Sequence, residues 1–122
     1  MWIFSEVGFF SVVEDWEDKS FVYVRARWKK DLMALSRMIH KECGFYMEKI
    51  KLTPKRDYPF RVHMSKRDWG DVMCCLGEDI NYGNFKGAIL DQYPERERVY
   101  MRVWSVMKEA ANPSKGNEPW EK

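Results

Sequence analysis

The chain has 122 residues, of which 45% are hydrophobic, 16% aromatic and 33% charged, and its formal net charge is +2. This length fits one contiguous core, and the apolar content is high enough to exclude an intrinsically disordered chain. A net charge so close to zero excludes nucleic-acid binding driven by bulk charge, so any such function would depend on local clustering of cations.

The three cysteines and the first residues of the chain bear on its compartment. Cys43, Cys74 and Cys75 are odd in number and show neither C-x-x-C spacing nor a neighbouring histidine pair, which is typical of a reducing compartment. The start, Met1 to Glu6, lacks the basic region of a signal peptide, and no stretch approaches the roughly 18 apolar residues of a membrane-spanning helix. We therefore expect a cytoplasmic protein without a membrane segment, a metal or a cofactor.

The first segments of the chain are typical of β-structure. Residues 2–13 are rich in aromatic and β-branched side chains and are interrupted by Gly8, which indicates a strand with a bulge or bend, or a tight hairpin, and of these we predict the strand. A polar turn at residues 14–20 leads to residues 21–28, where the side chains alternate between two faces. The apolar face of this segment consists of Val22, Val24 and Ala26. The opposite face consists of Tyr23, Arg25 and Arg27.

At Lys29 the apolar period changes from two to about three and a half, which predicts a helix. The apolar face of this helix consists of Leu32, Leu35, Met38 and Ile39. Gly44 is a suitable residue just beyond its end, because helices often finish with a left-handed glycine. Residues 48–52 form a candidate short strand. Its outward side chains are Lys49 and Lys51.

Residues 58–64 alternate again and predict a further strand, with Arg61 and His63 on its polar face. Ser65, followed three residues later by Asp68, is a near relative of the capping box that begins many helices. A second helix should therefore start here and stop near Gly77.

The last third of the chain should be a corner followed by two helices. Residues 79–86 are dense in turn formers and lead into a short helix through Leu90, and Pro94 suits the first turn of a final helix. That final helix carries a stripe spaced i, i+3, i+4, i+7, consisting of Tyr100, Val103, Trp104 and Met107. Residues 112–122 cannot build an apolar face and are expected to form a flexible tail.

These elements predict an α+β fold in a single domain covering residues 1–111. An antiparallel sheet of three to four strands should form one layer, and helices packed on one of its faces should form the other, giving a two-layer sandwich.

Six strings stand in order along the chain: MWIF at 1–4, GFFSVV at 8–13, VRAR at 24–27, YPFR at 58–61, DINYGNFK at 79–86 and VW at 103–104. With this order and spacing the chain resembles a family of small uncharacterised bacterial proteins, which we expect to extend to phage. The resemblance covers most of residues 1–107 and implies a shared fold, with no established activity to carry over. A longer, lysine-rich stretch between Lys41 and Arg56 departs from the family pattern.

Catalytic motifs are absent from the sequence, which has no nucleophile elbow, no phosphate-binding glycine loop and no metal-ligand spacing. Cys43 and His63 could form a thiolate–imidazole couple, although a buried thiol and a solvent-facing histidine explain the two residues more simply. The polar corner at 79–86 lacks the carboxylates of a calcium loop, and its asparagines are expected to satisfy backbone donors. We therefore expect a protein without catalytic activity of its own.

The functional hypothesis concerns the sheet face that the helices leave uncovered. Seven side chains should alternate onto this face: Tyr23, Arg25, Arg27, Lys49, Lys51, Arg61 and His63. Interleaved cations and aromatic rings suit an acidic protein partner, and they also suit the phosphates and bases of a single-stranded nucleic acid. A third interpretation is a solvated surface on which the charges serve only solubility.

We predict a small binding or regulatory protein that acts on a protein partner through this basic-aromatic face. Single-stranded nucleic-acid binding by the same face is the alternative, and a cryptic enzyme is the third hypothesis. If Phe9, Ser11 and Val13 also lie on the face, its apolar part would favour a protein interface or a homo-oligomer.

Overall fold

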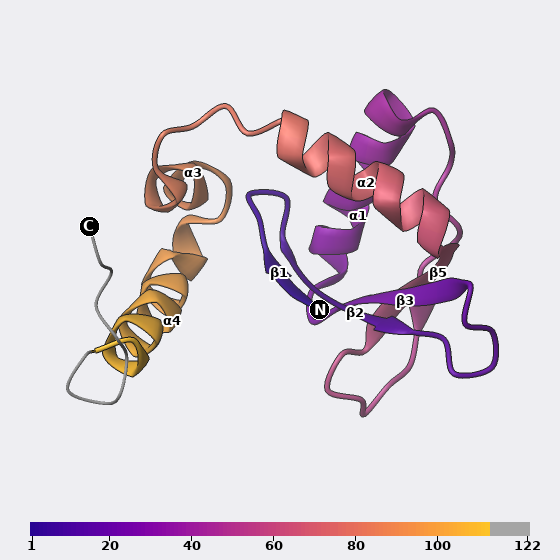
Figure 1. The fold of residues 1–122 in the computed structure, drawn as a ribbon, viewed down its shortest axis with the longest axis horizontal. Helices are drawn as coiled ribbons and strands as arrows, with labels where there is room; N and C mark the ends of the chain where they lie inside the picture. The colour runs from indigo at the N-terminus through magenta and orange to yellow at the C-terminus, as the bar shows by residue number, and fades with distance from the viewer. Residues whose placement is uncertain (113–122) are drawn as a thin grey trace, which may run out of the picture. The chain divides into compact units, whose positions relative to one another are not determined.

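The computed structural model describes residues 1–112, which belong to two compact units (Figure 1). The first unit covers residues 1–81 and the second begins at Tyr82. Each unit is described by itself below. The expected tail at 112–122 lies, apart from Asn112, outside the described residues.

The first unit is built on a five-stranded sheet in which all neighbours are antiparallel. In spatial order the strands are β1 (Trp2–Phe4), β2 (Phe9–Glu14), β3 (Phe21–Ala26), β5 (Phe60–Ser65) and β4 (Lys51–Leu52). Three to four strands were expected. The sheet has five because the first segment folds back as a hairpin, while the expected strand at 48–52 is reduced to two residues.

Gly8 explains why the first segment is a hairpin closely joined to the first helix. A Cβ atom at this position would lie 2.7 Å from the Cβ of Asp31, a distance that real Cβ atoms do not adopt. The Asp31 carboxylate accepts a hydrogen bond from the Phe9 N–H at 3.0 Å. The missing side chain therefore lets the hairpin approach the helix closely enough for this buried bond to form.

Two helices of the first unit cover one face of the sheet. The first, α1 (Lys29–Met38), continues into a π-helical turn (Ile39–Cys43) and ends at Gly44, whose φ of 76° is left-handed as the sequence predicted. The second, α2 (Lys66–Glu78), begins at Ser65, whose hydroxyl accepts from the Asp68 N–H. Figure 1 shows α1 and α2 on the same side of the strands.

The core of the first unit lies between these helices and the sheet. It consists of Phe10, Val12, Val22, Val24, Ala26, Leu32, Leu35, Met38, Ile39, Val62, Met64, Trp69 and Val72. Alternation explains the strand members, because every second residue of β3 and β5 points toward the helices. The α+β fold class and its antiparallel sheet are confirmed.

The second unit contains α3 (Phe85–Gln92), a 3₁₀ turn (Pro94–Arg96) and α4 (Glu97–Ala110). Asn84 caps α3 by accepting from the N–H groups of Lys86 and Gly87, which confirms the structural role expected for an asparagine at this corner. The Phe85 and Tyr100 rings stack with their centroids 6.1 Å apart.

The apolar stripe expected on α4 is present, but most of it faces solvent. Tyr100 is buried, whereas Val103, Trp104 and Met107 are exposed. None of the helices within residues 1–112 combines the length and the apolar character needed to cross a bilayer.

Candidate functional site

The candidate site is the sheet face opposite α1 and α2, here called the outer sheet face. Strand register places twelve side chains on it: Trp2, Phe4, Phe9, Ser11, Val13, Phe21, Tyr23, Arg25, Lys51, Arg61, His63 and Ser65. The helices of the first unit pack on the other side, so this face is formed only by side chains of the strands and their loops.

One row of directly opposed residues runs across all five strands of this face. Trp2 pairs with Ser11, Ser11 pairs with Arg25, Arg25 pairs with Arg61, and Arg61 pairs with Lys51. An indole therefore stands at one end of the row and three cations occupy the strands at the other end. We call these five residues the cross-strand row.

The three cations of the row repel one another. Like charges directly opposite each other destabilise a sheet, and partial burial followed by the charge of Arg61 lowers the pKa of Arg25. Among residues 1–112, no carboxylate lies within ion-pair distance of Arg25, Arg61 or Lys51. The buried Nε of Arg61 also has no hydrogen-bond partner in this part of the chain. Within residues 1–112 the three cations therefore have no ion-pair partner, and the Asp57 carboxylate acts on Arg25 only from beyond ion-pair distance.

Aromatic rings hold the arginines of this face in place. The Arg25 and Arg27 guanidiniums lie 4.8 and 4.7 Å from the centroid of the Tyr58 ring. Arg61 lies 5.6 Å from the Tyr23 ring. Each cation–π contact stabilises by roughly 0.5–1 kcal/mol and fixes the plane of the guanidinium. The stacking offsets part of the repulsion between the arginines.

Two further hydrogen-bonded contacts anchor the arginines at one side. Arg25 donates from Nη2 to the Ser11 hydroxyl at 2.7 Å. Arg27 follows β3 and donates to the Asp57 carboxylate at 3.1 Å, an exposed ion pair. Arg27 is thus partly neutralised, whereas the cations of the cross-strand row are not.

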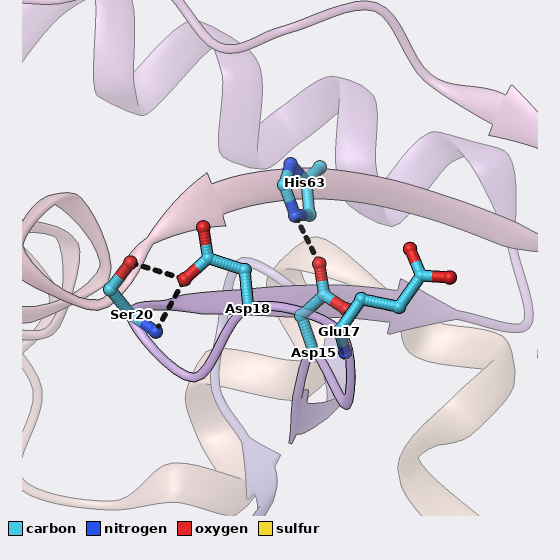
Figure 2. Close-up of polar contacts among 5 residues, drawn as sticks. All are labelled: Asp15, Glu17, Asp18, Ser20 and His63. Atoms are coloured by element: carbon cyan, nitrogen blue, oxygen red, sulfur yellow. Dashed lines mark hydrogen bonds and ion pairs between the residues drawn. The ribbon is translucent and has the colours of Figure 1, made fainter.

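His63 ties the loop between β2 and β3 to the same face. Its Nε2 lies 2.8 Å from the Asp15 carboxylate (Figure 2). Its ring stacks on Phe21 with centroids 4.6 Å apart. The backbone N–H of Glu17, followed by His63, lowers the pKa of Asp15. The loop is therefore folded back onto the face by a charge-assisted contact.

A second aspartate closes the same loop. Figure 2 shows Asp18 turned toward Ser20, whose N–H and hydroxyl both donate to one carboxylate oxygen, at 3.0 and 2.6 Å. The Ser20 hydroxyl, followed by its N–H, lowers the pKa of Asp18. These bonds are local to the loop and explain its shape without any ligand.

Apolar side chains border the cations. Trp2 is 69% exposed and Trp16, in the loop beside Asp15, is 84% exposed. Phe9 is buried beneath Trp2, Phe4 and Tyr58, whose rings contact it. The outer sheet face thus joins a cationic half to an aromatic half.

Six of the seven side chains proposed from the sequence lie on or beside this face. Tyr23, Arg25, Arg61, His63 and Lys51 lie in the register pairs of the face, and Arg27 reaches it from the end of β3. Lys49 is placed elsewhere, because it precedes β4 and lines an open hollow of about 380 Å³ with α1 residues Met33, Ser36 and Arg37. Phe9, Ser11 and Val13 also lie on the face, so part of the face is apolar.

Two contributors to the face were missed from the sequence. Tyr58 lies outside the strands, yet it is buried under two arginines, and Asp15 reaches His63 from a polar turn. Tyr58 begins the stretch predicted as a strand but falls on the parity of its inward face, and Asp15 lies in a turn without alternation. Each contacts residues of the face that are 30 or more positions away in sequence, so only the tertiary fold places them there.

The remaining chemical candidates are separated in space. Cys43 contacts Cys75 in the helix layer, whereas His63 lies on the outer sheet face, so the proposed thiolate–imidazole couple does not form. Within residues 1–112, no group of three or more His, Cys, Asp or Glu side chains is arranged to hold a metal ion. A hollow of about 150 Å³ beside His63 and Phe21 is smaller than an ordinary ligand pocket.

Comparison of the chain with known protein families, curated proteins and solved structures found no match. The resemblance to small bacterial proteins therefore stays a prediction.

Proposed function

We propose that this protein is a small cytoplasmic binding or regulatory protein, without catalysis of its own, whose outer sheet face holds a protein partner. The partner segment would present carboxylates to the three cations and an apolar side chain to Trp2. The cross-strand row is the observation that carries this proposal, because it places Arg25, Arg61 and Lys51 side by side with no acidic partner within residues 1–112.

The energetics of the row favour an anionic ligand. Arginine forks form paired hydrogen bonds with carboxylates, and charge-assisted bonds of this kind are about twice as strong as neutral ones. A carboxylate at the row would relieve the repulsion between Arg25 and Arg61. The sheet supplies these donors already positioned by stacking, which lowers the entropy lost on binding.

The rings of the face favour protein over nucleic acid. Base stacking needs a free ring face, but Tyr58 already contacts two guanidiniums, Tyr23 contacts one, and Phe21 stacks on His63. The exposed indoles of Trp2 and Trp16 instead resemble the aromatic anchors common in protein interfaces.

Charge reversal tests the proposal. Arg25→Glu with Arg61→Glu should abolish binding of the partner, because losing buried charge pairs costs about 2–5 kcal/mol each, or at least about 30-fold in affinity. The matched control is Lys29→Glu with Arg37→Glu, two exposed α1 residues that give the same change in net charge. Both variants, tagged and expressed in the protein's own cells, would be purified after nuclease treatment and compared by quantitative mass spectrometry.

A nuclease-resistant protein kept by the control and lost by the face variant would support the proposal. Equal recovery of all proteins by both variants would contradict it, provided that circular dichroism shows both to be folded.

The same row of cations is the observation that keeps single-stranded nucleic acid as the second candidate. Neutralising about three phosphates predicts a slope near −2 for the logarithm of affinity against the logarithm of salt concentration. Fluorescence anisotropy with a labelled oligonucleotide measures that slope. Binding that is absent at low salt, or insensitive to Arg25→Glu with Arg61→Glu, would exclude this candidate.

A further inference from the structure

Two thiols meet in the helix layer of the first unit, on the other side of the sheet from the outer sheet face. The Sγ atoms of Cys43 and Cys75 lie 3.0 Å apart, and both cysteines are free and half-buried. The third cysteine, Cys74, is exposed and its thiol donates to Glu78 at 3.1 Å. Cys74 and Cys75 are adjacent in sequence but have different partners. The close pair, Cys43 and Cys75, joins two helical elements.

The backbone places Cys43 at this contact in an unusual way. The π-helical turn Ile39–Cys43 extends α1 and ends at the left-handed Gly44, and Cys43 is its last residue. Cys75 lies in α2, which packs against this turn. Turns of π-helix are rare and occur often at functional positions. Here the turn brings the Cys43 thiol to the Cys75 thiol.

We propose that Cys43 and Cys75 form a modification site, a dithiol that a small-molecule disulfide such as oxidised glutathione closes to an intramolecular disulfide. The sulfur atoms would approach by about 1 Å, from their present contact to the bond length of about 2.05 Å. This site is independent of the proposed function, since it lies in the helix layer and involves none of the outer-face residues.

The chemistry has two steps. The Cys75 thiolate attacks one sulfur of glutathione disulfide, whose S–S bond breaks and releases one glutathione thiolate. The Cys43 thiol then loses its proton and attacks the Cys75 sulfur of the mixed disulfide, which releases the second glutathione thiolate. In total two protein thiols are oxidised, one glutathione disulfide is reduced to two glutathione thiols, and the two protons pass from the protein to the glutathione thiolates.

The surroundings fix the order of attack and the stability of the product. Burial, followed by the Cys75 contact, raises the pKa of Cys43 to about 12, and Cys43 donates its S–H to the Cys75 sulfur. Cys75 is therefore the first nucleophile and Cys43 the resolving thiol. Dithiols that are strong oxidants owe this to a stabilised thiolate. Cys43 lacks such stabilisation, so the disulfide should resist reduction once formed.

Closure would join the end of α1 to α2 across 32 residues of sequence. A crosslink of this span restricts the unfolded chain and should raise the midpoint of thermal unfolding by roughly 10 °C. The helix layer that backs the sheet would then be covalently fixed.

The experiment uses the reduced full-length protein incubated with a glutathione redox buffer at increasing ratios of oxidised to reduced glutathione. Samples are quenched with acid, alkylated with N-ethylmaleimide and measured by intact-mass and peptide-mapping mass spectrometry. We expect a product lighter by two hydrogens, with one alkylated cysteine and a Cys43–Cys75 link. The matched control Cys74→Ser should close equally well, whereas Cys75→Ser should form no internal link.

Three results would overturn the site. They are a link through Cys74, a stable mixed disulfide with glutathione at Cys43 or Cys75 in the folded wild-type protein, or closure only after unfolding in urea. A Cys43→Ser variant that is folded by circular dichroism and accumulates the mixed disulfide at Cys75 would support the proposed order of attack. Accumulation at Cys74 alone would contradict that order.

Discussion

The two faces of one sheet are stabilised by different forces. The inner face buries aliphatic and aromatic side chains such as Phe10 and Val24 against α1 and α2, so it depends on the hydrophobic effect and on tight packing. The outer face combines stacked arginines, rings and ion pairs, which depend on pH and salt. Residues adjacent in sequence therefore serve separate roles, because one face packs the core and the other carries the charged and aromatic side chains.

The largest effect should come from the inner face. Phe10 is fully buried, and Phe10→Ala should lower the free energy of unfolding by about 3–5 kcal/mol, because it removes a large ring and leaves a cavity. Val13→Ala, on the outer face of the same strand, should change it by less than about 0.5 kcal/mol. Urea unfolding followed by circular dichroism measures both. Equal losses would contradict the division between the faces.

A substitution in the cross-strand row should raise the free energy of unfolding, by less than the loss expected from Phe10→Ala. Arg61→Met keeps the aliphatic packing and removes the repulsion by Arg25 and the unpartnered Nε, but it also loses the stacking on Tyr23, so it should raise the free energy of unfolding by at most about 0.5 kcal/mol. The loop residue Arg56, exposed and outside the row, serves as control through Arg56→Met. A clear loss of stability in Arg61→Met alone would show that the row stabilises the fold instead of awaiting a partner.

The smallest expected effect is on the free energy of unfolding at acidic pH. Asp15, Asp18 and Glu14 all have a lowered pKa in the folded protein, caused first by the Glu17 N–H, the Ser20 hydroxyl and the Lys66 ammonium group respectively. Their contribution to stability is present above the ordinary carboxyl range and is lost as the pH falls below about 4 through the lowered values.

Asp15→Asn should therefore flatten the fall of unfolding free energy between about pH 5 and pH 2. His63→Gln separates the two causes, because it removes the imidazole while the Glu17 N–H remains, and it should keep part of the slope. Unfolding by urea at a series of pH values measures the effect. If the unfolding free energy of Asp15→Asn depends on pH as steeply as that of the wild-type protein, protonation of the Asp15 carboxylate does not affect stability.

Local patterns were sufficient to predict much of the fold. Alternation in β3 and β5 gave both faces correctly, Ser65 marked the start of α2, and Gly44 marked the end of the first helical segment. These signals involve residues a few positions apart, and each reflects a backbone group or a side chain that must be satisfied locally.

Long-range contacts account for what could not be predicted. The segment at 2–13 allowed a bent strand or a hairpin, and the choice depends on the approach of Asp31 to Gly8. In the candidate site, Tyr58 and Asp15 act through the tertiary fold, and Lys49 leaves the face because β4 is two residues long. No sequence period encodes these contacts.

The lengths of the outermost strands bear on how the protein behaves at high concentration. Long, flat edge strands can pair with strands of other molecules, which leads to filaments. In this sheet the edge strands are short: β1 has three residues and β4 has two, and β4 also carries the charge of Lys51. The sheet therefore offers few unpaired amides to a foreign strand, and a concentrated solution should resist fibre formation.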